Sequence, residues 1–159
     1  MEKTYAVTPI GRICAEEERS YIALGGNYGR GLEALEGFSH VVVLWWFHQS
    51  DEAAYREVLE AQSPYRRGPK TLGTFATRSP FRPNPIAMTV SRVLAVDAAG
   101  GRLYIDYTDA LDGSPVLDVK PYTPSLDRVE APTVPAWCAH WPRSLEASED
   151  FDWADEFNF

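Results

Sequence analysis

The sequence predicts a mainly β protein: a small, predominantly antiparallel β-barrel with one or two short helices. Short β-branched and aromatic segments follow one another closely, and glycine, proline and polar residues separate them, which is typical of such a barrel. Only residues 51–61, "DEAAYREVLEA", place apolar side chains at helical spacing, with acids in the first turn, so we expect the clearest helix there. One more helical turn is expected at residues 32–36.

The strand expected at the centre of the core is 40–48, "HVVVLWWFH". Its residues are β-branched or aromatic almost throughout, which predicts a strand buried on both faces. The stretch "DAAGG" has the composition of a tight turn and predicts a hairpin between the strands at 86–96 and 102–107. The other predicted strands are 5–14, 21–24, 71–77, 86–96 and 102–107.

The 159 residues fit one domain, which we place at residues 1–143, followed by an acidic, aromatic C-terminal tail at 144–159. The tail contains acids but no base and accounts for most of the net charge of −8. Residues 61–96 contain no acid, and we call them the basic island. Such a group of cations favours an anionic ligand, and the alternative is an ordinary solvated face balanced by acids elsewhere. The bases of the island are Arg66, Arg67, Lys70, Arg78, Arg82 and Arg92.

The sequence argues against several classes of protein. The longest apolar run, 41–47, is far too short to cross a bilayer, and no signal or transit peptide pattern opens the chain. We therefore expect a cytoplasmic protein without membrane association, with Cys14 and Cys138 reduced. The histidines and cysteines lack the spacing of metal ligands, so no metal is expected. "GRGLEA" at 29–34 matches a dinucleotide-binding pattern, but the next strand follows too soon for a parallel crossover.

The loop "TRSPFRPNP" is stiff and basic. Its prolines fix their own backbone angles and push the residues before them out of the helical region, so the loop is already extended. In an extended chain, Arg78, Arg82 and Asn84 share one side and could present two guanidiniums and an amide to a carboxylate or phosphate. The alternative is a strand-edge loop with ordinary surface arginines.

Two further segments contain candidate binding residues. "LDGSP" is a turn by composition, in which Asp112 and Gly113 can adopt unusual backbone angles. Asp118 and Lys120 share one face of the next short strand, either as a structural salt bridge or as two charges beside a ligand. The central strand ends in His48 and Gln49, which are polar groups at the point where the chain leaves the core. The alternative for His48 is a structural histidine at the end of a strand, whose ring nitrogens are hydrogen-bonded and bind no ligand.

Three blocks of the sequence together resemble the TsaA-like barrel family: "LEGFSHVVVLWWFHQ", "GTFATRSPFRPNPIAMTV" and "DALDGSPVLDVKPYTPSLD". The best-described members of this family are homodimeric tRNA methyltransferases that use S-adenosylmethionine, bound near the subunit contact, and methylate N6 of threonylcarbamoyl-adenosine beside the anticodon. The resemblance covers residues 10–127 and implies the small β-barrel fold. The cofactor contacts that it implies here are His48, Gln49, Arg78, Met88, Asp112, Gly113, Ser114 and Pro115.

The remaining assignments concern the acceptor. An N6 nitrogen that carries a carbonyl substituent is a poor nucleophile, so a base should remove its proton, and Asp118 and Tyr122 are the candidates. Arg82, Asn84 and Lys120 are candidate substrate-binding residues. The family's "P-R-Q" loop before the first block is replaced here by "ICAEEERSYIALGG", so contacts from that loop do not transfer to this chain.

Three hypotheses about function follow. The chain is a dimeric methyltransferase for a modified adenosine in tRNA, or the same barrel and cofactor methylate a small molecule, or the barrel binds RNA or a ligand without catalysis. The acidic tail bears on this choice, because it would repel an RNA backbone unless it folds back onto the basic island or onto a partner subunit.

Overall fold

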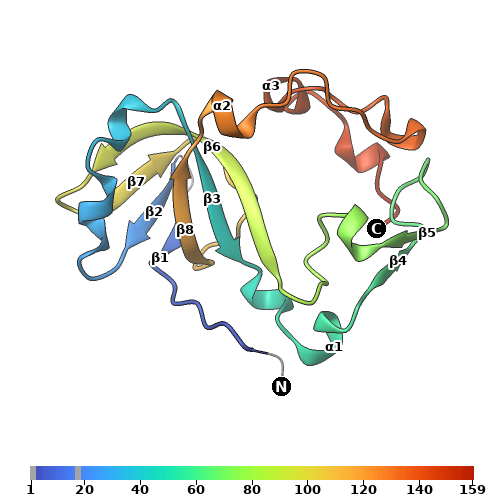
Figure 1. Cartoon of the computed structure of the whole chain (residues 1–159), viewed down its shortest axis with the longest axis horizontal. Helices are drawn as coiled ribbons and strands as arrows, with labels where there is room; N and C mark the ends of the chain where they lie inside the picture. The colour runs from blue at the N-terminus through green and yellow to red at the C-terminus, as the bar shows by residue number, and fades with distance from the viewer. Residues whose placement is uncertain (1–2, 17–18) are drawn as a thin grey trace. The chain divides into compact units, whose positions relative to one another are not determined.

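A computed structural model describes residues 3–16 and 19–159, and it divides the chain into two compact units (Figure 1). The first unit comprises Met1–Asp51 and Asn84–Arg128, and the second comprises Glu52–Pro83 and Val129–Phe159. The division predicted at residue 143 follows charge, whereas these units follow contacts between residues. The proline loop therefore passes from the second unit into the first at Asn84.

The first unit is a closed antiparallel barrel, which confirms the predicted fold class. Its strands lie in the order β1-β2-β7-β6-β3-β8, and pairing of β1 with β8 closes the ring. The hairpin predicted at "DAAGG" joins β6 to β7, and β6 bends at a register shift near Val93. The strands are β1 (Gly11–Ala15), β2 (Ser20–Leu24), β3 (His40–Trp46), β6 (Ile86–Asp97), β7 (Arg102–Ile105) and β8 (Pro115–Pro121).

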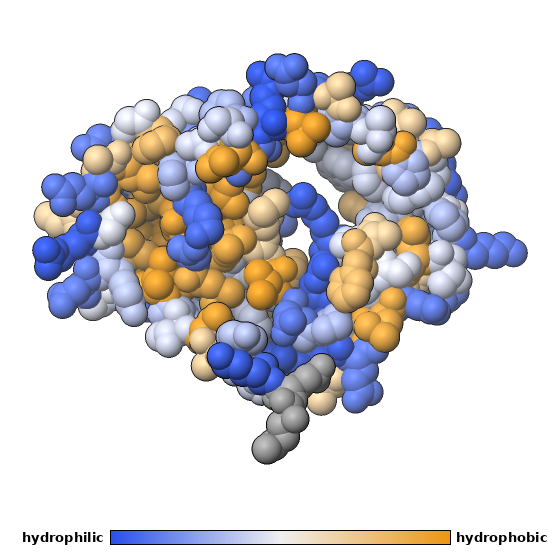
Figure 2. All heavy atoms as spheres, viewed as in Figure 1, coloured by the Kyte–Doolittle hydropathy of each residue, from blue (hydrophilic) through white to orange (hydrophobic). Residues whose placement is uncertain are grey.

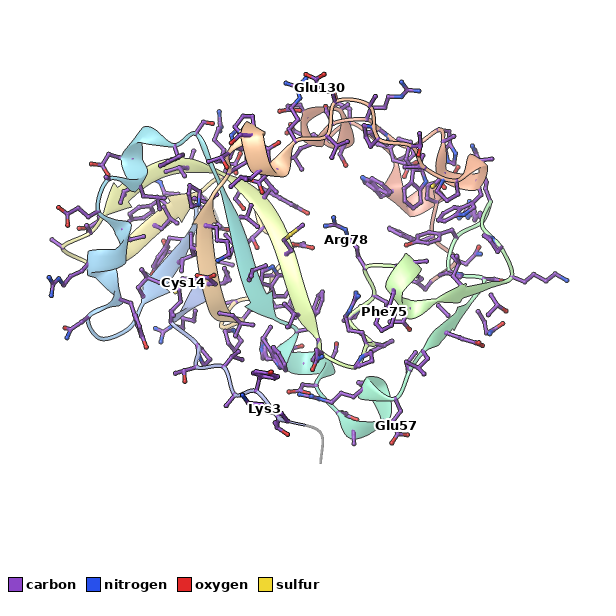
Figure 3. All side chains as sticks on the ribbon, in the orientation of Figure 1. Lys3, Cys14, Glu57, Phe75, Arg78 and Glu130 are labelled. Carbon is purple, nitrogen blue, oxygen red and sulfur yellow. The ribbon has the colours of Figure 1, made fainter. Side chains whose placement is uncertain are left out.

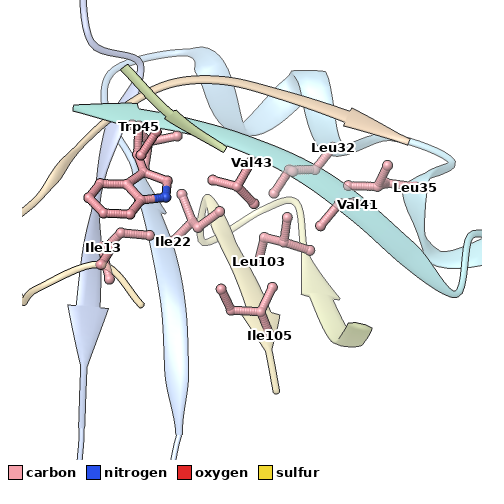
Figure 4. Close-up of a cluster of buried hydrophobic side chains, with 12 residues drawn as sticks. Ile13, Ile22, Leu32, Leu35, Val41, Val43, Trp45, Leu103 and Ile105 are labelled. Carbon is pink, nitrogen blue, oxygen red and sulfur yellow. The ribbon is translucent and has the colours of Figure 1, made fainter. Parts of the chain in front are cut away.

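Strand β3 is buried on one face only, so the prediction of a strand buried on both faces is wrong. Burial alternates along it, with Val41, Val43 and Trp45 inside and their neighbours half-buried. The reason is that a small barrel has a single interior, and successive side chains point alternately into it and away from it. Figure 4 shows this interior, where the three residues pack with Ile13, Ile22, Leu32, Leu35, Leu103 and Ile105.

Short helical pieces connect the strands of the first unit. The predicted turn near 32–36 is present as two 3-10 helices, η1 (Tyr28–Leu32) and η2 (Leu35–Gly37). Gly29 of η1 packs so closely on the β6–β7 hairpin that an added Cβ would lie 2.7 Å from the carbonyl oxygen of Ala98. The glycines of "GRGLEA" are thus part of a packed turn. Two more pieces are η3 (His48–Ser50) and α2 (Pro124–Asp127).

The helix predicted at 51–61 is correct only for its first turn, α1 (Ala53–Arg56). The chain then forms strand β4 (Glu60–Gln62), which pairs with β5 (Thr71–Gly73). The carbonyl oxygens of Val58 and Leu59 accept hydrogen bonds from the side chain and the backbone amide of Thr74. These tertiary hydrogen bonds outweigh a helical propensity that differs little from residue to residue. The 3-10 helix η4 (Thr74–Ala76) likewise replaces the second half of the predicted strand 71–77.

An aromatic cluster forms the centre of the second unit, and the C-terminal tail supplies much of it. The ring of Tyr65 stacks on Trp137, with centroids 5.2 Å apart, and also meets Phe157 at 5.8 Å. Arg66 pairs with Asp155, and Arg67 lies 4.0 Å from Glu156. The tail therefore folds back onto the basic island, which is one of the two arrangements in which it would not repel an RNA backbone. The helical pieces of the tail are α3 (Leu145–Ser148) and η6 (Trp153–Asp155), and η5 (Ala136–Cys138) precedes it.

Cys14 and Cys138 are unpaired, as the sequence predicts. Among the residues that the structure describes, no helix is both long enough and apolar enough to span a membrane. Within the same residues, no group of His, Cys, Asp and Glu side chains is arranged to hold a metal ion.

Candidate functional site

The turn that contains most of the predicted cofactor contacts is held against β1. Oδ1 of Asp112 accepts a hydrogen bond from the amide of Ala15 at 3.0 Å, and the amide of Gly113 donates to the carbonyl of Ile13 at 2.9 Å. Gly113 has a φ of 79°, in the left-handed region that favours glycine. The turn therefore has a fixed backbone, in which Asp112 and Gly113 are exposed and Ser114 is buried.

The same turn meets the end of the central strand. His48 opens η3 directly after β3, and its Nδ1 lies 3.3 Å from Oγ of Ser114. Trp45 of β3 pairs with Val116 of β8, so the end of one strand lies beside the start of the other. The structure thus brings His48, Gln49 and the turn at 112–115 to one end of the barrel.

Met88 lies near this end, on the outer surface of the barrel. In β6 it pairs with Leu44 of β3, whose other neighbour is Asp118 of β8, so the three residues form a row across the sheet. Met88 is 45% exposed and Ile86, one row closer to the end, is 42% exposed, while Ala87 between them is buried. Figure 2 shows apolar side chains gathered over the barrel strands in this view. The barrel thus has an apolar outer face beside the turn.

Asp118 has both carboxylate oxygens engaged. Oδ1 accepts a hydrogen bond from the amide of Val119 at 2.9 Å, and Oδ2 lies 2.5 Å from Nζ of Lys120. Both members of this ion pair are substantially exposed, so the pair contributes little to stability. The pairing that the sequence suggests between Asp118 and Lys120 is therefore present, and the two charges remain accessible to a ligand.

Tyr122 lies at the opposite end of β3 from the turn. Its amide donates to the carbonyl of His40 at 3.0 Å, and its ring meets that of His40 edge-on. From His40 to Trp46 the strand advances about 20 Å, at about 3.3 Å per residue. The structure therefore does not bring Tyr122 to His48 within one chain, and Asp118 lies between them along β8.

The proline loop is stabilised by one of its own arginines. Nη1 of Arg82 donates to the carbonyl oxygens of Thr77 and Ser79, each at 3.3 Å. This bonding differs from the predicted fork, in which Arg82 would point beside Arg78. Arg78 is exposed and extends away from the ribbon of the second unit (Figure 3). The third member of the predicted set, Asn84, is exposed and belongs to the first unit.

The charge of Arg78 acts on Tyr65. Burial is the main reason why the pKa of Tyr65 is raised above its ordinary value, and the guanidinium of Arg78 acts in the opposite direction. Among the described residues, no carboxylate forms an ion pair with Arg78. Arg78 is thus a cation of the second unit that remains accessible to an anion.

A polar chain inside the barrel was not foreseen from the sequence. Nε1 of the buried Trp45 donates to Oγ1 of Thr89 at 3.0 Å, and Thr89 donates to Oδ1 of Asp109 at 2.6 Å. Burial, and then the charge of Asp109, raise the pKa of Tyr107. The sequence does not signal it, because the large apolar residues at 86, 88 and 90 occupy the outward positions of β6 and Thr89 an inward one. These hydrogen bonds hold Trp45 in place next to the residues that lead to His48.

Comparison with known proteins identifies relatives of this chain. The family model described as the N-terminal domain of tRNA-methyltransferase O matches residues 3–128. A protein of Archaeoglobus fulgidus named S-adenosyl-L-methionine-binding protein is 40% identical over 110 residues, which are 69% of this chain and 73% of the relative. A protein of Eikenella corrodens named tRNA (adenine(37)-N6)-methyltransferase is 38% identical over 122 residues, which are 76% of this chain and 65% of the relative.

A solved structure of TrmO from P. aeruginosa has the same fold, with a TM-score of 0.66 and 33% sequence identity. The match covers 86% of this chain but only 62% of that structure. The chain described here therefore spans less than two thirds of that protein. The family match ends at residue 128, so it includes the whole barrel and the proline loop but not residues 129–159.

Proposed function

Because the chain belongs to the family of the tRNA-methyltransferase O N-terminal domain, we propose that it is an S-adenosylmethionine-dependent methyltransferase that acts on tRNA. The proposed acceptor is N6 of threonylcarbamoyl-adenosine beside the anticodon, in the cytoplasm. The contact between His48 and Ser114 supports this most directly, because it joins the two family blocks in which most of the proposed cofactor residues lie. The name of the Archaeoglobus relative supports the same cofactor, and the name of the Eikenella relative supports N6 of an adenine in tRNA as the acceptor.

The residues at the turn suit the chemical groups of S-adenosylmethionine, which has two positive groups, a carboxylate, a ribose and an adenine. Asp112 uses Oδ1 to bind Ala15, so we assign Oδ2 to the ammonium group or a ribose hydroxyl. Exposed Met88 offers apolar surface to the adenine, and the planar guanidinium of Arg78 suits the carboxylate. The remaining contacts proposed for the cofactor are His48, Gln49, Gly113, Ser114 and Pro115.

When bound, S-adenosylmethionine supplies a methyl group on a positively charged sulfur. The residues of the chain then have to hold the acceptor nitrogen in line with the methyl carbon and accept the proton that the nitrogen loses. We propose Asp118 as the base, because it lies in the row of Met88. Tyr122 is one strand length from the turn, so Tyr122 would act only from a second subunit. Lys120, Arg82 and Asn84 are the residues that we propose for binding the substrate.

We propose that the protein forms a homodimer through the apolar outer face of the barrel. Ile86 and Met88 are large apolar residues that are more than 40% exposed on adjacent outward positions of β6. The half-buried side chains of Val42 and Leu44 continue this surface on β3. An apolar surface of this kind is typical of an interface, and it would place the subunit contact beside Met88 and hence beside the cofactor.

The tail supports a second acceptor class, a small molecule. Its acids pair with Arg66 and Arg67, so two bases of the basic island are already balanced within the chain. The same pairing also removes an obstacle to RNA, because the acids face cations of their own chain. We favour tRNA, because the name of the Eikenella relative states that acceptor.

The test is transfer of a labelled methyl group to tRNA from a strain that lacks the N6-methyl modification. We expect incorporation into that tRNA and none into tRNA from the parent strain. Cofactor binding without incorporation would refute the tRNA assignment and leave the small-molecule acceptor.

Calorimetry with S-adenosylmethionine tests the third hypothesis, a barrel without catalysis, since a module that no longer uses the cofactor should show no heat. Mass spectrometry of the purified protein should detect bound cofactor or its demethylated product.

A further inference from the structure

The turn around Phe75 reverses the usual placement of polar and aromatic residues. Thr74 and Thr77 are 2% and 9% exposed, whereas Phe75 is 79% exposed. A phenylalanine gains about 25 cal/mol for each Å² that it buries, so an exposed ring between two buried threonines forgoes that stabilisation. The ring therefore lies open to its surroundings on a turn whose threonines face inward.

Hydrogen bonds from the two threonines hold this turn in place. Oγ1 of Thr74 donates to the carbonyl of Val58 at 2.9 Å, and Oγ1 of Thr77 donates to the carbonyl of Thr74 at 2.8 Å. The amide of Ser79 donates in turn to Oγ1 of Thr77 at 3.3 Å. The backbone that presents Phe75 is thus already ordered, so little conformational entropy is lost when the ring binds a partner.

Two cations near Phe75 in the chain favour an anionic partner with an aromatic surface. Phe75 lies in the basic island, three residues before Arg78 (Figure 3) and five after Lys70. Both cations are exposed, and among the described residues no carboxylate forms an ion pair with either. A second aromatic residue, Phe81, follows on the same loop. Its ring centroid lies 4.4 Å from that of Tyr55, with the two rings tilted by 35°, and Phe81 is 39% exposed. Exposed aromatic rings among cations are the combination with which proteins bind single-stranded nucleic acid: the ring stacks on a base and the cations meet the phosphates.

We propose that Phe75 is a stacking platform for an unpaired nucleobase of the RNA substrate, in the loop that contains the acceptor adenosine. This inference rests on the proposed tRNA methyltransferase function and specifies where the RNA meets the second unit. An unpaired base fits the site because both faces of a stacked base pair are covered, whereas a loop base can offer one face to the ring. The contact is independent of base identity, so it contributes affinity rather than sequence recognition.

The test compares variants of the full chain for binding to an anticodon stem-loop RNA and to S-adenosylmethionine. We expect Phe75→Leu to weaken RNA binding about tenfold and Phe75→Trp to preserve it, because stacking requires a ring and not merely an apolar side chain. Cofactor affinity should be unchanged in both. Leu59→Ala is the matched control, since Leu59 is 59% exposed in the same unit and its carbonyl accepts the amide of Thr74. That variant should leave RNA binding unchanged.

Abasic RNAs identify the base that stacks on Phe75. Removing that base should weaken RNA binding by the wild-type protein. It should not change RNA binding by the Phe75→Leu variant, because that variant has already lost the stacking contact. Additive losses at every position of the loop would overturn the proposal. Equal RNA affinity of Phe75→Leu and the wild type would also overturn it, while methyl transfer by both would leave the proposed function intact.

Two other outcomes have distinct meanings. If Phe75→Leu changes the oligomeric state in sedimentation experiments at unchanged RNA affinity per subunit, the ring belongs to a subunit contact and the stacking proposal is wrong. If the wild type binds the cofactor but neither binds nor methylates RNA, the proposed tRNA function is wrong, and the stacking proposal is wrong with it.

Discussion

Nε2 of His140 lies 2.6 Å from Oε1 of Glu156 inside the second unit. The carboxylate is 4% exposed and also accepts a hydrogen bond from Nε1 of Trp141 at 3.1 Å. A buried carboxylate is tolerated only when it is paired and hydrogen-bonded, and here its partners come from the C-terminal segment and from Arg67 of the basic island. Glu156 is therefore a junction between the tail and the rest of the second unit.

This junction predicts a loss of stability in acid. The hydrogen bond from His140 is the main reason why the pKa of Glu156 lies below its ordinary value of 4.5. A carboxyl group with a lowered folded-state pKa stabilises the protein above its unfolded-state pKa, and this contribution disappears as the pH falls through the folded-state value. We expect Glu156→Gln to lower the unfolding temperature at pH 7, measured by tryptophan fluorescence. The difference from the wild type should shrink below pH 4.5.

Asp155→Asn is the matched control for Glu156→Gln. Asp155 is the neighbouring acid and forms an ion pair with Arg66 in which both side chains are more than half exposed. Such exposed pairs contribute about 0–1 kcal/mol, so we expect a small change in the unfolding temperature that salt reduces further. An equal effect of the two substitutions at every pH would contradict the role assigned to the buried carboxylate.

The hydrogen bonds that join Trp45, Thr89 and Asp109 inside the barrel predict that substitution of Thr89 lowers the free energy of unfolding. Thr89→Val keeps the shape of the side chain but leaves Nε1 of the buried Trp45 without its acceptor. An unsatisfied buried donor costs about 1–3 kcal/mol. Urea unfolding should show a loss of this size in the free energy of unfolding. Thr71→Val removes an exposed side-chain hydrogen bond to Gln62 and should change that free energy by less than about 0.5 kcal/mol.

The barrel could be predicted from the sequence because its evidence is local. Composition rich in β-branched and aromatic residues and the "DAAGG" turn predict strands β6 and β7 without knowledge of distant residues. The helix predicted at 51–61 is too long because Val58 and Leu59 accept hydrogen bonds from Thr74, and the residues after them pair with β5, far along the chain. Local propensity cannot report a contact of that kind.

The candidate site was predictable to a similar extent. Family blocks in the sequence identified His48 and the turn at 112–115, and the structure brings these together. The bonding of Arg82 to the carbonyls of Thr77 and Ser79 was missed, because residue parity assumes an extended loop and the loop turns back on itself. The separation of Tyr122 from the turn follows from strand register, which the sequence of one strand does not reveal.

The turn at Asp112 predicts how the charge and the position of this residue contribute to cofactor binding. Asp112→Ala removes the charge and also the acceptor for the amide of Ala15, so we expect calorimetry to show at least a tenfold loss of affinity for S-adenosylmethionine. Asp112→Asn retains an oxygen acceptor without the charge. If Asp112→Asn loses as much affinity as Asp112→Ala, Asp112 binds the ammonium group. If Asp112→Asn binds the cofactor with near-normal affinity, Asp112 binds a ribose hydroxyl. Unchanged affinity of Asp112→Ala would remove Asp112 from the site.

Among these substitutions, we expect replacement of Arg78 to have the largest effect on cofactor binding. It is exposed, and no carboxylate of the described residues pairs with it, so its guanidinium can bind the carboxylate of S-adenosylmethionine through two parallel hydrogen bonds. We expect Arg78→Ala to abolish the calorimetric signal. Arg78→Lys should give intermediate affinity, because an ammonium group keeps the charge but not the planar pair of donors.

Arg92→Ala is the control for the general loss of a positive charge in the basic island. Arg92 lies 3.4 Å from Asp106 and is 60% exposed, so its removal should leave both stability and cofactor affinity nearly unchanged. If Arg92→Ala and Arg78→Ala weaken cofactor binding equally, the effect is one of net charge and not of a specific contact. If Arg78→Ala binds as tightly as the wild type, Arg78 does not hold the cofactor, and its exposed guanidinium is then available for a phosphate of the RNA.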